Sequence, residues 1–256
     1  MKDPFRIFFP IGIILAVIGT APWLFQLFGR PFYDVDFHRS LMINGFLLSF
    51  VSGFLMTAVP RFTQSTFAHR FEITMVGAGI LTSAFFTFQH QVEYSHLAAG
   101  LANLSLVVFS VRRFVTRKAT PPPTFIFVGV GMALWLLSNF LLYFLVPLSP
   151  AFHLWHQVFV SGGILSLVIG IGSRLIPAIL GWQEVLPATQ NTNATLPLLL
   201  AMVFVASYFI PGQYGNWLKF FLTLYIAVKY WHLYKLPKEK SILAKCIWLC
   251  SWCLAF

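Results

Sequence analysis

Long apolar runs separated by short polar segments repeat along the whole chain. Most hold about 20 residues, the length that an α-helix needs to cross the hydrocarbon core of a bilayer. The pattern predicts an all-α polytopic transmembrane bundle of about 8–9 spans, which forms one integral membrane domain over residues 1–256. The expected spans, of which the last is cut off by the chain end, are Phe5–Phe28, His38–Phe62, Glu72–Gln91, Ser95–Phe114, Pro122–Val146, Ala151–Leu180, Leu196–Ile210, Asn216–Lys235 and Ile242–Phe256.

Composition agrees with this pattern. Hydrophobic residues make up 58% of the chain and charged residues only 9%, whereas a soluble domain is about 25% charged. The first apolar run is too long for the hydrophobic region of a signal peptide, so we interpret it as an uncleaved span. The low share of charged residues excludes an ordinary soluble protein.

The distribution of basic residues predicts the orientation in the membrane. If the spans alternate and the N-terminus is cytoplasmic, all but three of the 17 Lys and Arg residues lie on the cytoplasmic side. The exceptions are Arg30, Arg39 and Lys219. This asymmetry is what the positive-inside rule describes. The net charge of +10 therefore indicates contact with membrane lipid and no nucleic-acid partner.

Histidines open two of the predicted spans and are the candidate chemistry of the chain. His38 begins the second span, and His153 and His156 begin the sixth. Both spans run from outside to inside, so His38 and His156 start at similar depth. Imidazole is an axial ligand of haem iron, and helical bundles hold haem in this way. The alternatives are that both histidines bond to loops or water, or that His153 and His156 together chelate one metal ion.

In each of these spans, the residues that follow the histidine at helical spacing form a stripe of mainly small and polar side chains. The stripe of the second span is His38, Met42, Gly45, Ser49 and Ser52, and that of the sixth is His153, His156, Gly163, Gly170 and Arg174. We therefore expect both imidazoles to point into the bundle. Arg61 and Arg174 close the two spans at the opposite face, where they reach lipid phosphate or pair with Glu72, Glu184 or an anionic cofactor group.

The remaining histidines are expected to be structural. His90 and His96 flank a short outer loop and are interpreted as solvated. His69 lies in an inner loop, and His232 lies among interfacial aromatic residues.

The same two spans carry a resemblance to a known family. The block formed by His38, Met42, Gly45, Phe46 and residues 52–63 resembles the second-helix signature of the NnrS family, and the stretch from His156 to Arg174 resembles a later motif of that family. Arg112, Arg113, Arg117 and Trp135 fit the intervening segment, so that about two-thirds of the chain is covered. NnrS proteins are polytopic membrane proteins that carry haem and copper and act in the response to nitric oxide.

This chain departs from the family pattern at several positions. Phe37, Ser40 and Leu41 stand where the family has tryptophan, a second histidine and glutamate. Ile179 and Trp182 stand where it has histidine and arginine. These departures argue against copper and leave His38 and His156 as the matched pair for haem, with Met42, Arg61 and Arg174 as further cofactor contacts and His153 as a further metal ligand.

The resemblance implies a haem-binding protein of the bacterial inner membrane, active in nitric oxide tolerance or respiratory metabolism, with haem between the second and sixth spans. A small gaseous ligand such as nitric oxide and a respiratory-chain partner are the implied partners. The alternatives are a small-solute transporter or channel and a non-catalytic accessory subunit of a respiratory oxidase. We do not expect a full oxidase reaction, because intramembrane carboxylates are scarce.

Overall fold

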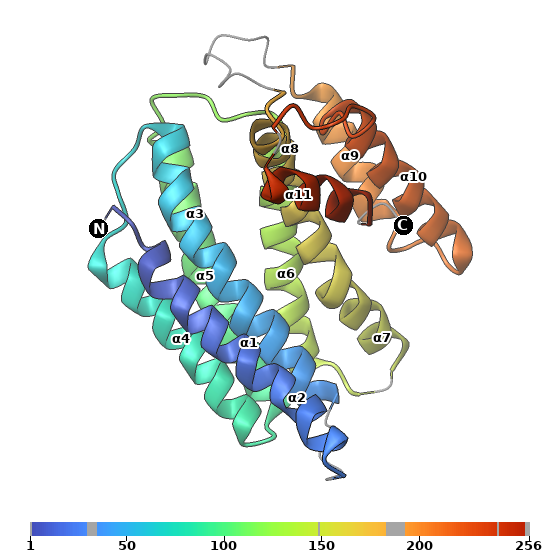
Figure 1. Cartoon of the computed structure of the whole chain (residues 1–256). Coiled ribbons are helices and arrows are strands. Elements are labelled where there is room, and N and C mark those ends of the chain that lie inside the picture. The colour runs from blue at the N-terminus through green and yellow to red at the C-terminus, as the bar shows by residue number, and fades with distance from the viewer. Residues whose placement is uncertain (1, 30–34, 148, 183–192, 240, 254–256) are drawn as a thin grey trace. The chain divides into compact units, whose positions relative to one another are not determined.

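The computed structural model describes residues 2–29, 35–147, 149–182, 193–239 and 241–253. Over these ranges the chain is helical and contains no strand, which confirms the predicted all-α class (Figure 1). Its elements are α1 (Phe5–Leu27), α2 (Val35–Ser40), the π-helical segment η1 (Leu41–Leu47), α3 (Leu48–Thr63), α4 (Arg70–Phe88), α5 (Val92–Val115), α6 (Phe125–Phe144), α7 (Pro150–Gln157), the π-helical segment η2 (Val158–Gly162), α8 (Gly163–Ile179), α9 (Thr195–Ala206), α10 (Gln213–Lys229) and α11 (Ile242–Cys253).

Six helical stretches of the described chain are long and apolar enough to cross a membrane, fewer than the eight or nine predicted. They correspond to the first six expected spans, and the second and sixth each run through a π segment, over Val35–Thr63 and Pro150–Ile179. The three later runs form shorter helices of 12, 17 and 12 residues. In the seventh, the helix gives way to turns after Ala206, and Pro211 and Gly212 (φ 70°) separate it from α10.

The chain divides into two compact units. The first comprises Met1–Thr120 and Trp135–His156, and the second comprises Pro121–Leu134 and Gln157–Phe256. The boundary passes through α6 and through the last turn of α7.

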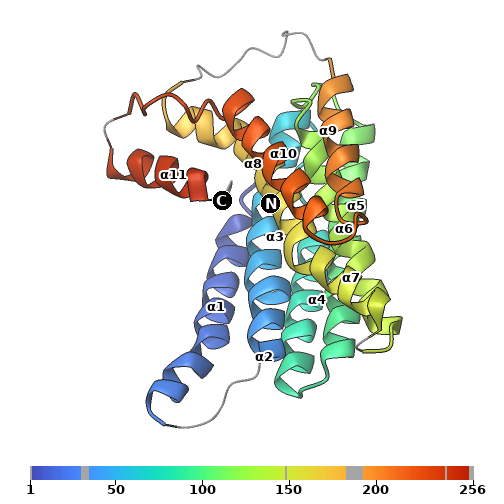
Figure 2. The same ribbon diagram turned by 90° about the vertical axis from the view of Figure 1, so that its right-hand side faces the viewer.

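In the first unit, the second span is the most buried of the candidate spans. Helix α1 packs along η1 and α3, while α4 and α5 form a hairpin on the other side (Figures 1 and 2). The small residues of the second span admit α1: a Cβ on Gly45 would lie 3.1 Å from Leu15, and a Cβ on Gly53 would lie 3.0 Å from Phe9. Small residues are typical of close helix contacts in membranes. The predicted stripe of the second span is therefore partly covered by α1.

The hairpin of α4 and α5 depends on another close approach. A Cβ on Gly79 would lie 2.8 Å from the Cβ of Ala102 and 3.1 Å from its Cα. Because helix backbones approach this closely only where side chains are small, Gly79 and Ala102 fix the separation of the two helices.

In the second unit, α8 packs against the first half of α6. A Cβ on Gly170 would lie 2.8 Å from the backbone nitrogen of Val128, and one on Gly131 would lie 2.9 Å from the carbonyl of Gly163. The indole of Trp231 is fully buried and donates a hydrogen bond to Ser173 Oγ (3.2 Å). The small residues of the sixth span thus allow close helix packing.

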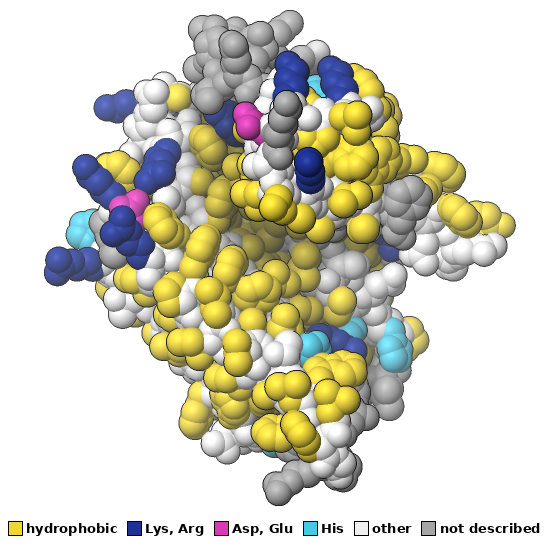
Figure 3. Space-filling model, in the orientation of Figure 1, with side chains coloured by type: hydrophobic (Ala, Val, Ile, Leu, Met, Phe, Trp, Pro, Cys, Tyr) yellow, Lys and Arg dark blue, Asp and Glu magenta, His cyan; other side chains and the backbone are white. Residues whose placement is uncertain are grey.

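The outer surface of the first unit is apolar along its helices. Exposed apolar side chains include Ile14 and Val17 on α1, Leu81 and Phe85 on α4, and Val108 on α5. Figure 3 shows hydrophobic side chains along the helices of this unit, with a group of Lys and Arg side chains at its edge near the N-terminus. An apolar belt with charges at its end is the surface that a bilayer requires.

Candidate functional site: a histidine cluster and an ion-pair pocket

His38 lies on α2 with one ring nitrogen held by the backbone of α1. Its Nδ1 is 2.7 Å from the carbonyl oxygen of Gly19 and 3.4 Å from Nε1 of Trp23. We assign the hydrogen to Nδ1, since a carbonyl only accepts and the contact to Gly19 is the shorter. The imidazole therefore keeps a lone pair on Nε2. Metal-binding histidines commonly have this arrangement, in which the second nitrogen donates to a backbone carbonyl.

His156 lies in the same unit and is joined to the His38 segment by Arg39. Arg39 Nη1 is 2.7 Å from His156 Nε2, and it also donates to Asp36 Oδ1 (3.1 Å). Because a guanidinium only donates, Nε2 of His156 is the acceptor and its imidazole is neutral. The structure thus brings the two predicted histidine segments to one corner of the unit. It also places an arginine, next in sequence to His38, on the nitrogen that His156 would offer to a metal.

A third histidine, His96 at the start of α5, joins this region and was not predicted to. It is buried, and its Nδ1 lies 3.0 Å from Oδ1 of Asn139, whose amide nitrogen donates to the carbonyl of Trp135. The residue before it, Ser95, contacts Ser40 (2.9 Å), which follows His38 by two positions. The expectation of a solvated His96 is therefore wrong. The available signal was the small and polar residues that follow His96 at helical spacing, Ala99, Gly100 and Asn103, which are also buried.

Buried hydroxyl groups lie beside these histidines. Ser40, which stands where the family pattern has a second histidine, is 2.9 Å from Thr87 Oγ1 and 2.9 Å from Ser95 Oγ. Ser83 lies 2.9 Å from the same Ser95 hydroxyl. The position of the absent histidine is therefore occupied by a side chain whose hydrogen bonds are made within the bundle.

The other predicted site residues are distributed over both units. Met42 packs against Gly19, as His38 does. His153 is exposed, and Arg174 belongs to α8 of the second unit. Arg61 pairs with Asp3 (3.0 Å) and not with Glu72. Glu184 lies outside the described residues.

In the part of the chain that the structure describes, no three His, Cys, Asp or Glu side chains lie close enough to hold a metal ion. The three predicted metal ligands His38, His153 and His156 are therefore not assembled into one coordination set in this structure. Haem needs no such set, because the porphyrin supplies four ligands and the protein one or two.

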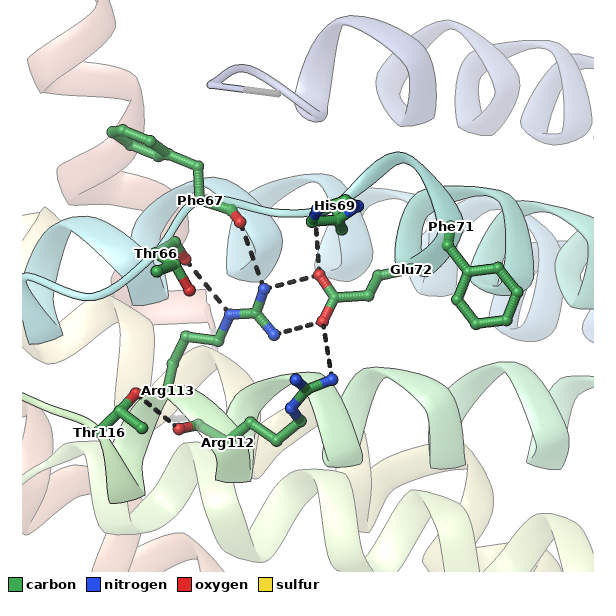
Figure 4. A pocket seen from close by; sticks show the side chains of 8 residues that line it. All are labelled: Thr66, Phe67, His69, Phe71, Glu72, Arg112, Arg113 and Thr116. Carbon is green, nitrogen blue, oxygen red and sulfur yellow. Dashed lines mark hydrogen bonds and ion pairs between the residues drawn. The ribbon is translucent and has the colours of Figure 1, made fainter.

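A second polar site lies where α4 begins and α5 ends, and sequence reasoning did not find it. Arg113, whose side chain is 5% exposed, donates to both carboxylate oxygens of Glu72, which is 15% exposed; the bond to Oε2 is 2.6 Å (Figure 4). The backbone N–H of His69 donates to Glu72 Oε2 (2.8 Å), so Glu72 also caps α4. Two features of the sequence could have indicated this site: the acidic Glu72 in the first turn of α4, and Arg112 and Arg113 in the last turn of α5.

This ion pair forms the floor of a pocket of about 370 Å³. Arg113 also donates to the carbonyls of Thr66 and Phe67 (both 3.3 Å), which ties the loop before α4 to the end of α5. Arg112 lies at the mouth of the pocket, with Nη1 3.8 Å from Glu72 Oε1 (Figure 4). His69, which was expected to be a structural loop residue, thus lines the same cavity as Arg112.

The helical fold, its candidate spans and its apolar surface define a polytopic membrane protein whose first unit carries a histidine cluster at one end of α5 and an ion-pair pocket at the other. The family model described as NnrS protein matches residues 1–256, the whole chain, and the chain therefore belongs to the NnrS family. The resemblance noted in two blocks of sequence extends over the full length. No curated protein and no solved structure matches the chain.

Proposed function

We propose that this NnrS-family protein resides in the bacterial inner membrane, binds haem through His38, and acts in the response to nitric oxide. The observation that supports this proposal best is the contact between His38 Nδ1 and the carbonyl of Gly19 (2.7 Å). It orients the imidazole and leaves Nε2 as the ligating atom. Bound haem would supply an iron atom able to bind a small gaseous ligand.

The two histidines differ in how readily each could bind haem iron. His38 fits as it stands, whereas Nε2 of His156 accepts a hydrogen bond from Arg39 (2.7 Å). For His156 to act as a second ligand, Arg39 has to turn away from it. The released guanidinium is suited to pair with a carboxylate, and haem carries two. Arg39 thus has a role with and without haem: it pairs with His156 when haem is absent and with a haem carboxylate when haem is bound.

Expression in a haem-competent host, followed by absorption spectroscopy and metal analysis of the purified protein, tests the proposal. We expect a Soret band that His38→Ala removes and that His232→Ala, a histidine change in the second unit, leaves intact. His156→Ala reports whether the iron has a second histidine ligand. Absence of a Soret band in the wild type, or a spectrum indifferent to His38→Ala, would refute haem binding.

The same preparation separates the alternatives. Solute uptake into proteoliposomes without a bound chromophore would favour a transporter or channel. Stable co-purification with a respiratory oxidase, again without haem, would favour an accessory subunit.

A further inference from the structure

The pocket between the start of α4 and the end of α5 contains two arginines with different roles. Arg113 is committed to the fold, because its N–H groups reach Glu72 and the carbonyls of Thr66 and Phe67. The side chain of Arg112 is 72% exposed, and the carboxylate oxygen nearest to its guanidinium, on Glu72, is 3.8 Å away. That distance is too long for a hydrogen bond. Among the described residues, the Arg112 guanidinium therefore donates no hydrogen bond within the protein.

The charge of the pocket favours an anion. Glu72 balances one of the two arginines that line it, and the other charge is left over. Further positive charge lies nearby: Lys2 Nζ is 5.8 Å from the ring of Phe67 at the pocket wall, and Arg70 is exposed at the start of α4. A planar guanidinium with unused donors matches the geometry of phosphate oxygens.

The rim of the pocket is apolar and faces outward. Phe71 is 68% exposed, and Phe67 is also exposed, although both line the pocket. Figure 4 shows the ring of Phe71 beside Glu72 on the α4 side, with that of Phe67 pointing away from the ion pair. A polar floor beneath exposed aromatic rings suits a molecule with a charged head and an apolar tail, such as a phospholipid at the membrane interface.

We propose that this pocket is a binding site for the phosphate group of an anionic membrane phospholipid. Arg112 donates to the phosphate oxygens, and Phe71 contacts the glycerol and upper acyl region. The Glu72–Arg113 pair holds the start of α4 and the end of α5 together and thereby positions the neighbouring Arg112. The predicted orientation places the pocket at the cytoplasmic leaflet, where anionic lipids attract basic segments.

A titration of the detergent-purified full-length protein with short-chain phosphatidylglycerol, followed by isothermal calorimetry, tests this site. Parallel titrations use short-chain phosphatidylcholine and inorganic phosphate. Wild type is compared with Arg112→Gln, Arg112→Lys and the control Arg117→Gln, which removes an equal charge from the same basic run but does not line the pocket. Size-exclusion profiles and circular dichroism verify that each variant is folded.

We expect phosphatidylglycerol to bind the wild type and Arg112→Gln to weaken it about tenfold, with partial retention in Arg112→Lys. Diffuse attraction to the surface is worth about fivefold per basic residue and would be lost equally from Arg112→Gln and Arg117→Gln. Equal losses in these two variants would therefore overturn the proposal. Equal affinity for phosphatidylcholine, or binding of inorganic phosphate as tight as that of the lipid, would overturn it as well.

Discussion

The Glu72–Arg113 pair gives the sharpest stability prediction for this protein. Glu72→Gln keeps the size of the side chain but removes the charge, leaving an Arg113 side chain that is 5% exposed without its counter-ion. Removal of one partner from a buried ion pair costs about 3–5 kcal/mol, because the remaining charge is uncompensated. The pocket leaves Glu72 15% exposed, which lets water reach the pair. We therefore expect the lower end of this range, about 3 kcal/mol.

Thermal unfolding in detergent, followed by circular dichroism, measures the effect. A loss of 3 kcal/mol corresponds to a decrease in Tm of about 6–12 °C for a chain of this size. The control is Glu93→Gln, which alters an exposed acidic residue in the first turn of α5 and is expected to cost about 0.5 kcal/mol or less. In the double variant Glu72→Gln/Arg113→Met no uncompensated charge remains, so part of the loss should be recovered. A Glu72→Gln loss below about 1 kcal/mol, or a double variant as unstable as the sum of the single ones, would refute this account of the pair.

Two further predictions concern packing and pH. Gly79→Val should destabilise the α4–α5 hairpin by about 1–3 kcal/mol, because its Cβ would meet Ala102 at 2.8 Å; Gly77→Ala, whose nearest neighbour would be 3.8 Å away, is the control, and equal Tm values for the two variants would contradict the proposed close approach. Burial, and secondarily Lys235, lower the pKa of His232 below its usual 6.5. As the pH falls from about 6.5 towards the lower folded pKa, the unfolded chain binds more protons than the folded one, so stability decreases over that window. Tm measured against pH should therefore decrease less on acidification in His232→Gln than in wild type. Identical Tm profiles would exclude a contribution of His232 to the acid sensitivity.

The sequence predicts the six long spans of the described chain, because an apolar run of bilayer length identifies a helix without knowledge of its neighbours. It predicts too many spans in the C-terminal part, because hydrophobicity does not report where a helix ends. The run Leu196–Ile210 is apolar throughout, yet α9 ends at Ala206 and a turn follows. Local turn geometry there outweighs composition.

The candidate site shows a similar division between local and long-range information. His38 and His156 are predicted because each begins an apolar span, and that signal is local. The contact of Arg39 with His156 joins residues 117 positions apart, and the pair of Glu72 and Arg113 joins residues 41 positions apart. Which arginine meets which partner depends on how helix ends are juxtaposed, and no periodicity within one helix contains that information.

Two π segments interrupt the predicted stripes. Each begins within three residues of a predicted histidine, η1 at Leu41 after His38 and η2 at Val158 after His156. A π turn holds an additional residue, so a 3.6-residue stripe drawn through it changes face. In both spans a serine hydroxyl donates to a carbonyl of this region, Ser49 to Gly45 and Ser161 to Gln157, a bond that often bends helices. The direction of the histidine side chains is thereby set separately from that of the small residues further along each span. Because π segments often occur at functional sites, this shared arrangement supports the role proposed above for the histidine ends of the two spans.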